Sequence, residues 1–281
     1  MNSPPATGLQ ANYAGRLLAL AGASFAQLMR APSHSRRAEA ARRSARHAVL
    51  LTAVIAVVIV TLMYAFDAQE ISLMPVRGTP SLWPFRILTD FGKDEYVLGT
   101  LAALLLFVAI VAPAVRAIPR SLLLRLGTHL QFLFFAVLLS VLTGELIKWI
   151  VGRGRPFVGG KANPFNFSHF AGTEAYSSFP SGHSITACAL AFAIASVWPR
   201  ARNAVIVYAL VIVATRLVLL AHHPSDVVAG ALVGIIGAMT VRYWFAARRL
   251  GFAIRSDGTI VPLAGPSPDR LKRVARGAFA S

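Results

Sequence analysis

Long apolar stretches recur along the chain and are separated by short polar and basic segments. The stretches cover residues 48–66, 96–115, 126–147, 182–198, 204–220 and 227–247. A helix of about 20 apolar residues crosses a bilayer, so each stretch is interpreted as one membrane-spanning helix, although 182–198 is short for a span. The pattern predicts an all-α fold: a polytopic membrane protein built as a six-transmembrane-helix bundle.

Composition supports the same interpretation. Hydrophobic residues make up 56% of the 281 residues and charged residues only 14%, whereas an average soluble domain has about 25% charged residues. A soluble fold of this size would lack the polar side chains needed to cover its surface. The low charge content also excludes intrinsic disorder for most of the chain.

The two ends of the chain differ from its middle. Residues 1–47 are predicted to form a basic cytoplasmic N-terminal tail, 48–247 the transmembrane domain and 248–281 a basic cytoplasmic C-terminal tail. In the first tail, apolar residues fall near helical spacing, which fits an interfacial amphipathic helix as well as a disordered tail; they are Leu17, Leu18, Ala21, Phe25, Leu28 and Met29.

The formal net charge of +17 indicates an anionic partner. Because the basic residues lie between apolar runs, a membrane surface fits them better than nucleic acid does. Segments 1–47, 116–125, 199–203 and 248–281 hold 7, 3, 2 and 7 Lys and Arg residues. By the positive-inside rule both termini are cytoplasmic. Loops 148–181 and 221–226 then lie on the outer face of the membrane.

Three clusters of unusual polar residues fall on this predicted outer face. Lys148 ends the third span and is followed by Arg155 and Pro156, and the tetrapeptide at 180–183 begins the fourth span. The third cluster joins the last two spans and contains Arg216, His222, His223 and Asp226. Scattered charges would not gather on one side of the membrane, so these clusters indicate a single site.

The clusters contain groups suited to binding an anion. Arg155 and Arg216 offer planar N–H donors that match phosphate oxygens, and Lys148 adds a point charge. Ser181 and Gly182 open a helix, whose unpaired N–H groups favour an anion. The sequence therefore predicts a phosphate-binding site.

Histidines beside such a site suggest proton transfer and nucleophilic attack. His222 and Asp226 are four residues apart, so on a helical turn the carboxylate can fix the tautomer of the ring. The other ring nitrogen is then free to attack phosphorus, and His183 can protonate the leaving oxygen. Acidic residues are few and Cys188 is the single cysteine, so no metal site and no cofactor are expected.

These motifs resemble those of the type 2 phosphatidic acid phosphatase and vanadium haloperoxidase superfamily, in its membrane lipid-phosphatase branch. The family pattern of Lys, six residues and Arg-Pro matches Lys148 through Pro156, and its Pro-Ser-Gly-His occurs unchanged at 180–183. The third motif, Ser-Arg, five residues, His, three residues and Asp, matches 215–226 with Thr215 in place of Ser. The resemblance covers residues 96–247.

The resemblance implies a metal-independent lipid phosphatase that works through a phosphohistidine, and we expect it at the periplasmic face of a bacterial-type inner membrane. It makes His222 the nucleophile, Asp226 its orienting group and His183 the general acid. Phosphate-binding roles fall to the remaining motif residues: Lys148, Arg155, Ser181, Gly182 and Arg216. The implied partners are the bilayer and a lipid phosphate: phosphatidylglycerol phosphate, phosphatidic acid, undecaprenyl diphosphate or a lipid A phosphate.

Several alternatives remain open at this stage. The same phosphohistidine could pass its phosphoryl group to another lipid, and a non-enzymatic anion or lipid transporter would also explain an intramembrane Arg216. Arg153 could be an interfacial anchor or an accessory phosphate ligand, and Glu145 a structural ion-pair partner of Lys148. The role of His223 and the oligomeric state are not predicted.

Overall fold

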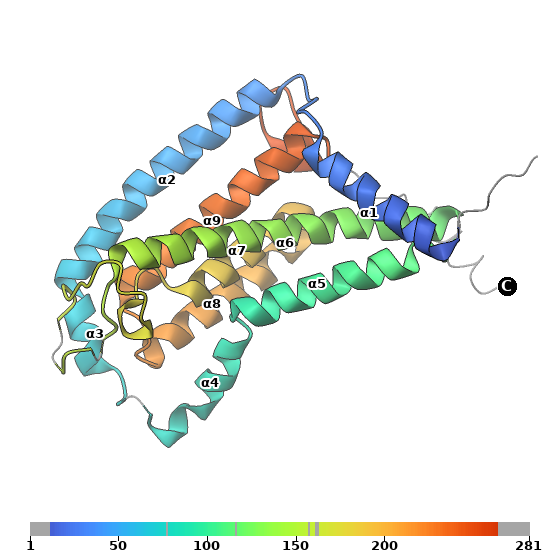
Figure 1. The fold of residues 1–281 in the computed structure, drawn as a ribbon. Helices are drawn as coiled ribbons and strands as arrows, with labels where there is room; N and C mark the ends of the chain where they lie inside the picture. Colours follow the sequence, from blue (N-terminus) through green and yellow to red (C-terminus); the bar gives the residue numbers. More distant parts are fainter. Residues whose placement is uncertain (1–11, 77, 116, 157, 161–162, 264–281) are drawn as a thin grey trace, which may run out of the picture.

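Helices dominate the structure, a computed structural model that describes residues 12–263 except 77, 116, 157 and 161–162 (Figure 1). In chain order the elements are α1 (Tyr13–Met29), α2 (Arg37–Ala65), α3 (Asp67–Leu73), η1 (Pro80–Leu82), α4 (Trp83–Asp90), α5 (Asp94–Val111), α6 (Ala117–Val151), η2 (Glu174–Tyr176), α7 (Gly182–Val197), η3 (Pro199–Ala201), α8 (Arg202–Val218), α9 (Pro224–Ala247), β1 (Phe252–Ile254) and β2 (Ile260–Pro262). The predicted all-α class is confirmed.

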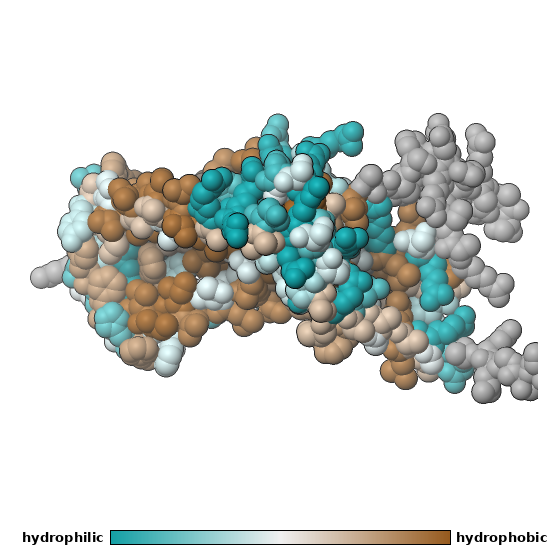
Figure 2. Space-filling model, turned by 90° about the horizontal axis from the view of Figure 1, so that it is seen from above, coloured by the Kyte–Doolittle hydropathy of each residue, from teal (hydrophilic) through white to brown (hydrophobic). Residues whose placement is uncertain are grey.

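Within the described part of the chain, five segments are long and apolar enough to cross a membrane: Arg37–Ala65, Pro80–Val111, Pro119–Val151, Pro199–Val218 and Pro224–Ala247. Helix α7 is equally apolar but has only 16 residues, so six crossings remain a prediction. Most apolar side chains of α2 are exposed, among them Val49, Val54 and Val57, which suits a helix that faces lipid. Figure 2 shows hydrophilic side chains around the basic start of α2 and hydrophobic ones beyond it.

Small residues allow α6, α7 and α9 to pack closely at the centre of the bundle. A Cβ atom on Gly230 or Gly234 of α9 would collide with backbone atoms of α7, and one on Gly144 of α6 would collide with Ile185 of α7. Close backbone approach through small residues is typical of helix packing in membranes. The packing fixes how the starts of α7 and α9 lie relative to the end of α6.

The bundle has two distinct ends (Figure 1). Helix α1, the start of α2, the end of α9 and the β1–β2 hairpin lie at one end. Helix α3, the loop after α6, and the starts of α7 and α9 lie at the other. The segments that carry the three motifs thus share an end, opposite the described terminal segments.

The tails and the first long loop contain more structure than the apolar pattern predicted. Residues 13–29 are helical, in agreement with the helical alternative for the N-terminal segment, and α2 begins at Arg37, well before the apolar run. Helices α3 and α4 occupy the loop between the first two predicted spans. The C-terminal segment contains the β1–β2 hairpin, and residues 264–281 lie outside the described part of the chain.

Candidate active site

The loop that follows α6 carries two of the arginines and folds back on itself. Gly152 has φ +56°, and a Cβ there would collide with the backbone of Ser168, so this left-handed end of α6 requires glycine. The amide of Gly154 donates to the carbonyl of Asn166 at 2.8 Å, and the amide of Ser178 donates to the carbonyl of Arg153 at 3.0 Å. These bonds fix the backbone of the loop at Arg153.

The start of α7 is anchored to α9. Ser181 is the N-cap residue of α7, and its amide donates to the carbonyl of Asp226 at 3.0 Å. A Cβ on Gly182 would come 3.0 Å from Nζ of Lys148, so the ammonium group lies directly against the first turn. Unpaired N–H groups at a helix start and a nearby cation both favour an anion.

His222 is buried, with only 3% of its surface exposed, and its ring is fixed by a backbone carbonyl. Its Nδ1 lies 2.8 Å from the carbonyl oxygen of Ser178. A carbonyl only accepts hydrogen bonds, so Nδ1 must carry the proton and Nε2 must hold a lone pair. The Asp226 carboxylate is 4.0 Å from Nδ1. The expected direct contact is thus replaced by one with Ser178.

The surroundings of His222 favour its neutral form. Burial, together with the positive charges of Arg216 and Arg155, holds the pKa of His222 well below its usual value of 6.5. A neutral imidazole with a protonated Nδ1 is a nucleophile at Nε2. Nε2 of His222 is therefore a candidate nucleophile.

Three cations lie around the two histidines. Nη1 of Arg216 donates to Oγ1 of Thr89 in α4 at 2.7 Å, and Nε of Arg155 donates to the carbonyl of Glu174 at 3.0 Å. Lys148 pairs with Glu145 at 2.5 Å, the ion pair considered from the sequence. The charges of all three act on both His183 and His222, so the five side chains together are a candidate anion-binding site.

A buried polar network lies behind His222 and is centred on Arg153, which is fully buried. Its Nη1 donates to Oδ1 of Asp226 at 2.6 Å, its Nη2 to Oδ2 of Asp67 at 2.8 Å, and its Nε to the carbonyl of Pro164 at 2.9 Å. The interpretation of Arg153 as an interfacial anchor is wrong, because no part of its side chain reaches the surface.

His223 is also fully buried, but it contacts α3. Its Nδ1 lies 3.3 Å from the carbonyl of Asp67, and its amide donates to Oδ2 of Asp226 at 2.9 Å. Burial lowers the pKa of His223 as well. These contacts give His223 a structural position and leave the ring of His222 beside the cations.

Four residues of the site were not predicted from the sequence. Asp67 follows the first apolar run, where an acidic residue is an ordinary feature of a membrane boundary. Thr89, Ser178 and Ser225 are single hydroxyl residues without a distinctive spacing. Among the described residues, no group of three or more His, Cys, Asp or Glu side chains could hold a metal ion.

Comparisons with known proteins agree with the motif resemblance. Residues 130–250 match the model of the PAP2 superfamily, a span that includes all three motifs. The recognition made from those motifs is therefore confirmed for this segment.

The curated relatives include two proteins named lipid A 1-phosphatase. The chain is 40% identical over 127 residues to the one from Rhizobium johnstonii, and 39% identical over 127 residues to the one from Rhizobium etli. The alignments cover 45% of this chain and 52% and 55% of those relatives, so the chain spans about half the length of the curated relatives it matches.

A third relative is matched over more of its length at lower identity. The bacitracin transport permease protein BcrC of Bacillus licheniformis is 26% identical over 198 residues, which cover 67% of this chain and 94% of that protein. No solved structure matches the chain.

Proposed function

We propose that this protein is a metal-independent phosphatase of the bacterial inner membrane that removes a phosphate group from a membrane lipid. The observation that carries the proposal is the His222 ring, whose Nδ1 is held on the Ser178 carbonyl at 2.8 Å and whose Nε2 is the free nucleophile. The three cations around it can neutralise the negative charge of a phosphoryl group and donate hydrogen bonds to its oxygens from fixed positions.

In the first step the phosphoryl oxygens bind among Arg216, Arg155, Lys148 and the amide groups at the start of α7. Nε2 of His222 attacks phosphorus, a P–N bond forms and the bond from phosphorus to the lipid oxygen breaks. The negative charge of the bound phosphate offsets that of the cations and allows His183 to hold a proton, which it donates to the departing oxygen. The lipid alcohol leaves and a phosphohistidine remains.

In the second step water replaces the lipid alcohol. His183, now unprotonated, accepts a proton from the water molecule as its oxygen attacks phosphorus. The P–N bond breaks, inorganic phosphate is released, and His222 regains its lone pair. Asp226 and Ser178 keep Nδ1 oriented through both steps, so the histidine returns to its starting tautomer.

The substrate we propose is a lipid A-type molecule that carries a phosphate on its sugar. Support comes from the two relatives named lipid A 1-phosphatase, whose sequence identity of 40% and 39% over 127 residues exceeds the 26% of the third relative. Both termini are cytoplasmic in this proposal, because the basic segments lie at the opposite end from the site. The active site then faces the periplasm.

Phosphate release by the purified full chain in detergent with excess chelator tests the proposal. Wild-type protein should release inorganic phosphate from lipid A, and His222→Ala should reduce the rate by at least about a thousandfold, since the nucleophile is lost. His47→Ala, an exposed histidine at the opposite end, is the matched control and should keep full activity. Equal rates for the wild type and His222→Ala would remove the assigned nucleophile.

Product analysis in the same experiment separates the alternatives. A phosphotransferase would yield a newly phosphorylated lipid when an acceptor lipid is added. A transporter would move lipid or anion across reconstituted vesicles without releasing phosphate, and would give no reason for the tautomer of His222.

A further inference from the structure

We propose that Asp67 and Arg153 are positioning residues, which together hold Asp226, Ser178 and the nucleophile His222 in place. Helix α3, which contains Asp67, is therefore part of the active site. The inference rests on the proposed function and adds two residues that the three motifs do not specify. Asp67 also lies outside the segment that matches the superfamily model, 130–250.

The contacts of Asp67 are unusual for an acidic residue at a membrane boundary, because its side chain is fully buried. Oδ2 accepts from Nη2 of Arg153 at 2.8 Å and from the hydroxyl of Ser225, and Oδ1 accepts from the amide of Ser225 at 3.1 Å. Asp67 thereby joins α3 to the first turn of α9, the turn that contains Asp226.

Arg153 connects Asp67 to Asp226. Its Nη1 donates both to Oδ1 of Asp226 and to Oγ of Ser225 at 2.6 Å. One guanidinium therefore lies between two buried carboxylates, and neutralising Asp67 removes one of the two charged acceptors that fix the orientation of Arg153. Such a network has one geometry in which every member is satisfied.

The path from Asp226 to the nucleophile is short. Oδ2 of Asp226 accepts from the hydroxyl of Ser178 at 2.6 Å, and the carbonyl of the same Ser178 holds Nδ1 of His222 at 2.8 Å. A shift of Asp226 would therefore move Ser178 and rotate the imidazole. A misplacement of about 1 Å in an active site can cost roughly a hundredfold in rate.

The test compares Asp67→Asn with wild type in purified full-length protein, using phosphate release from lipid A. Asparagine keeps the size of the side chain but removes its charge and replaces one carboxylate oxygen with an NH2 group, so Arg153 or Ser225 loses an acceptor. We expect kcat to fall about tenfold to a hundredfold while KM stays within about twofold, since Asp67 does not contact the phosphate-binding cations. Asp257→Asn, at the opposite end, is the matched control.

A second variant covers the case in which Asp67→Asn does not fold. Ser225→Ala removes the hydroxyl between Asp67 and Arg153 without changing charge, and it should lower kcat in the same way by a smaller factor. Folded variants with wild-type kcat and only a lower melting temperature would overturn the proposal. Absence of phosphate release by the wild type would instead refute the proposed function.

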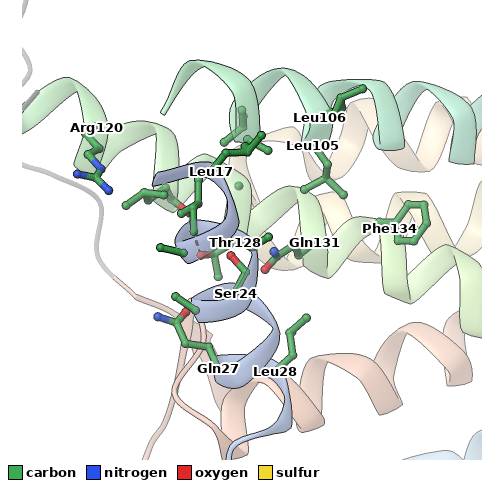
Figure 3. Close-up of a pocket in the computed structure, with 18 of the residues that line it drawn as sticks. Leu17, Ser24, Gln27, Leu28, Leu105, Leu106, Arg120, Thr128, Gln131 and Phe134 are labelled. Atoms are coloured by element: carbon green, nitrogen blue, oxygen red, sulfur yellow. Dashed lines mark hydrogen bonds between the residues drawn. The ribbon is translucent and has the colours of Figure 1, made fainter. Parts of the chain in front are cut away.

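A different observation carries a second proposal at the other end of the bundle. A cavity of about 760 Å³ lies between α1, α5 and α6. Figure 3 shows Leu17, Ser24 and Leu28 of α1 on one side and Gln131 and Phe134 of α6 on another. Most of its lining is apolar, and Arg16 and Arg120 also line it.

We infer that this cavity binds one phospholipid with an anionic head group. Basic pockets between membrane helices on the cytoplasmic side favour such lipids, each arginine adding about 1 kcal/mol. The apolar walls, among them Leu105 and Leu106 of α5, suit acyl chains, and the two guanidinium groups suit the phosphate.

Native mass spectrometry of full-length protein from nanodiscs of equal parts phosphatidylglycerol and phosphatidylcholine tests this inference. Wild type should retain phosphatidylglycerol preferentially. In the double variant Arg16→Gln/Arg120→Gln, this preference should fall about fivefold for each arginine removed. The control double variant Arg46→Gln/Arg200→Gln removes the same charge outside the cavity and should keep the wild-type preference. Equal preference in both double variants, or none in the wild type, would overturn the inference.

Discussion

Nδ1 of His222 lies 2.8 Å from the backbone carbonyl of Ser178 and 4.0 Å from the carboxylate of Asp226. The tautomer of the histidine is thus fixed by the backbone, and Asp226 fixes Ser178 through the serine hydroxyl. In a direct histidine–carboxylate contact, the carboxylate both orients the ring and supplies a compensating negative charge. Here the Ser178 carbonyl orients the ring, and Asp226 supplies the buried negative charge.

Activity should persist at mildly acidic pH. Because burial and the nearby arginines lower the pKa of His222, the neutral, nucleophilic ring remains populated below the ordinary histidine pKa of 6.5. A pH profile of kcat/KM should therefore place the acidic limb assigned to His222 below pH 6.5. A limb at or above that value would contradict the environment described for this ring.

Thr89 should contribute to catalysis through Arg216. Replacing Thr89 by Val keeps the shape of the side chain but removes the Oγ1 that accepts from Nη1 of Arg216 at 2.7 Å. Losing one hydrogen bond to a charged group costs about 1.5–3 kcal/mol, so kcat/KM should fall roughly tenfold to a hundredfold. Thr79→Val, in the same loop but outside the site, is the control, and an equal loss in both variants would argue against this role.

Gly182→Ala should weaken substrate binding. An added Cβ would come 3.0 Å from Nζ of Lys148, so the ammonium group must move away from the helix start. Because a lysine end is flexible, we expect a KM several-fold higher with an unchanged melting temperature. Steady-state kinetics over a substrate series check this, and unchanged KM would show that Lys148 does not contact the substrate.

Glu70 should make the protein less stable as the pH rises. Its side chain is buried, and burial together with the charges of Asp67 and Asp226 raises its pKa from 4.5 to about 8. The unfolded chain releases this proton first, so stability is lost as the pH rises between those two values. Neither carboxyl oxygen has a hydrogen-bond partner among the described residues.

Glu70→Gln should remove that pH dependence. The variant should melt several degrees higher than wild type at pH 8.5, for a gain of about 1–3 kcal/mol, and the difference should vanish near pH 4.5. Tryptophan fluorescence during heating in detergent measures it. A difference that is the same at both pH values would exclude titration of Glu70 as the cause.

The sequence predicted the parts of this molecule that repeat or follow a fixed spacing. Apolar runs indicated the helices, and the residues at 148–156, 180–183 and 215–226 lie at one end of the bundle. Asp67 and Thr89 could not be found in this way, because their roles come from long-range contacts with Arg153 and Arg216. Arg153 was interpreted as an interfacial anchor or an accessory phosphate ligand, because sequence alone does not reveal that two buried carboxylates surround it.

The most direct test of the account is to trap the enzyme-bound phosphoryl group. Full-length protein is mixed with lipid A labelled in its phosphate and quenched in alkali within one turnover. Wild-type protein should carry the label on a bond that is stable in alkali and lost in acid, as expected for a phosphorus–nitrogen bond, and peptide mapping should place it on His222. Rapid phosphate release with no labelled protein, or label on another residue, would contradict the account.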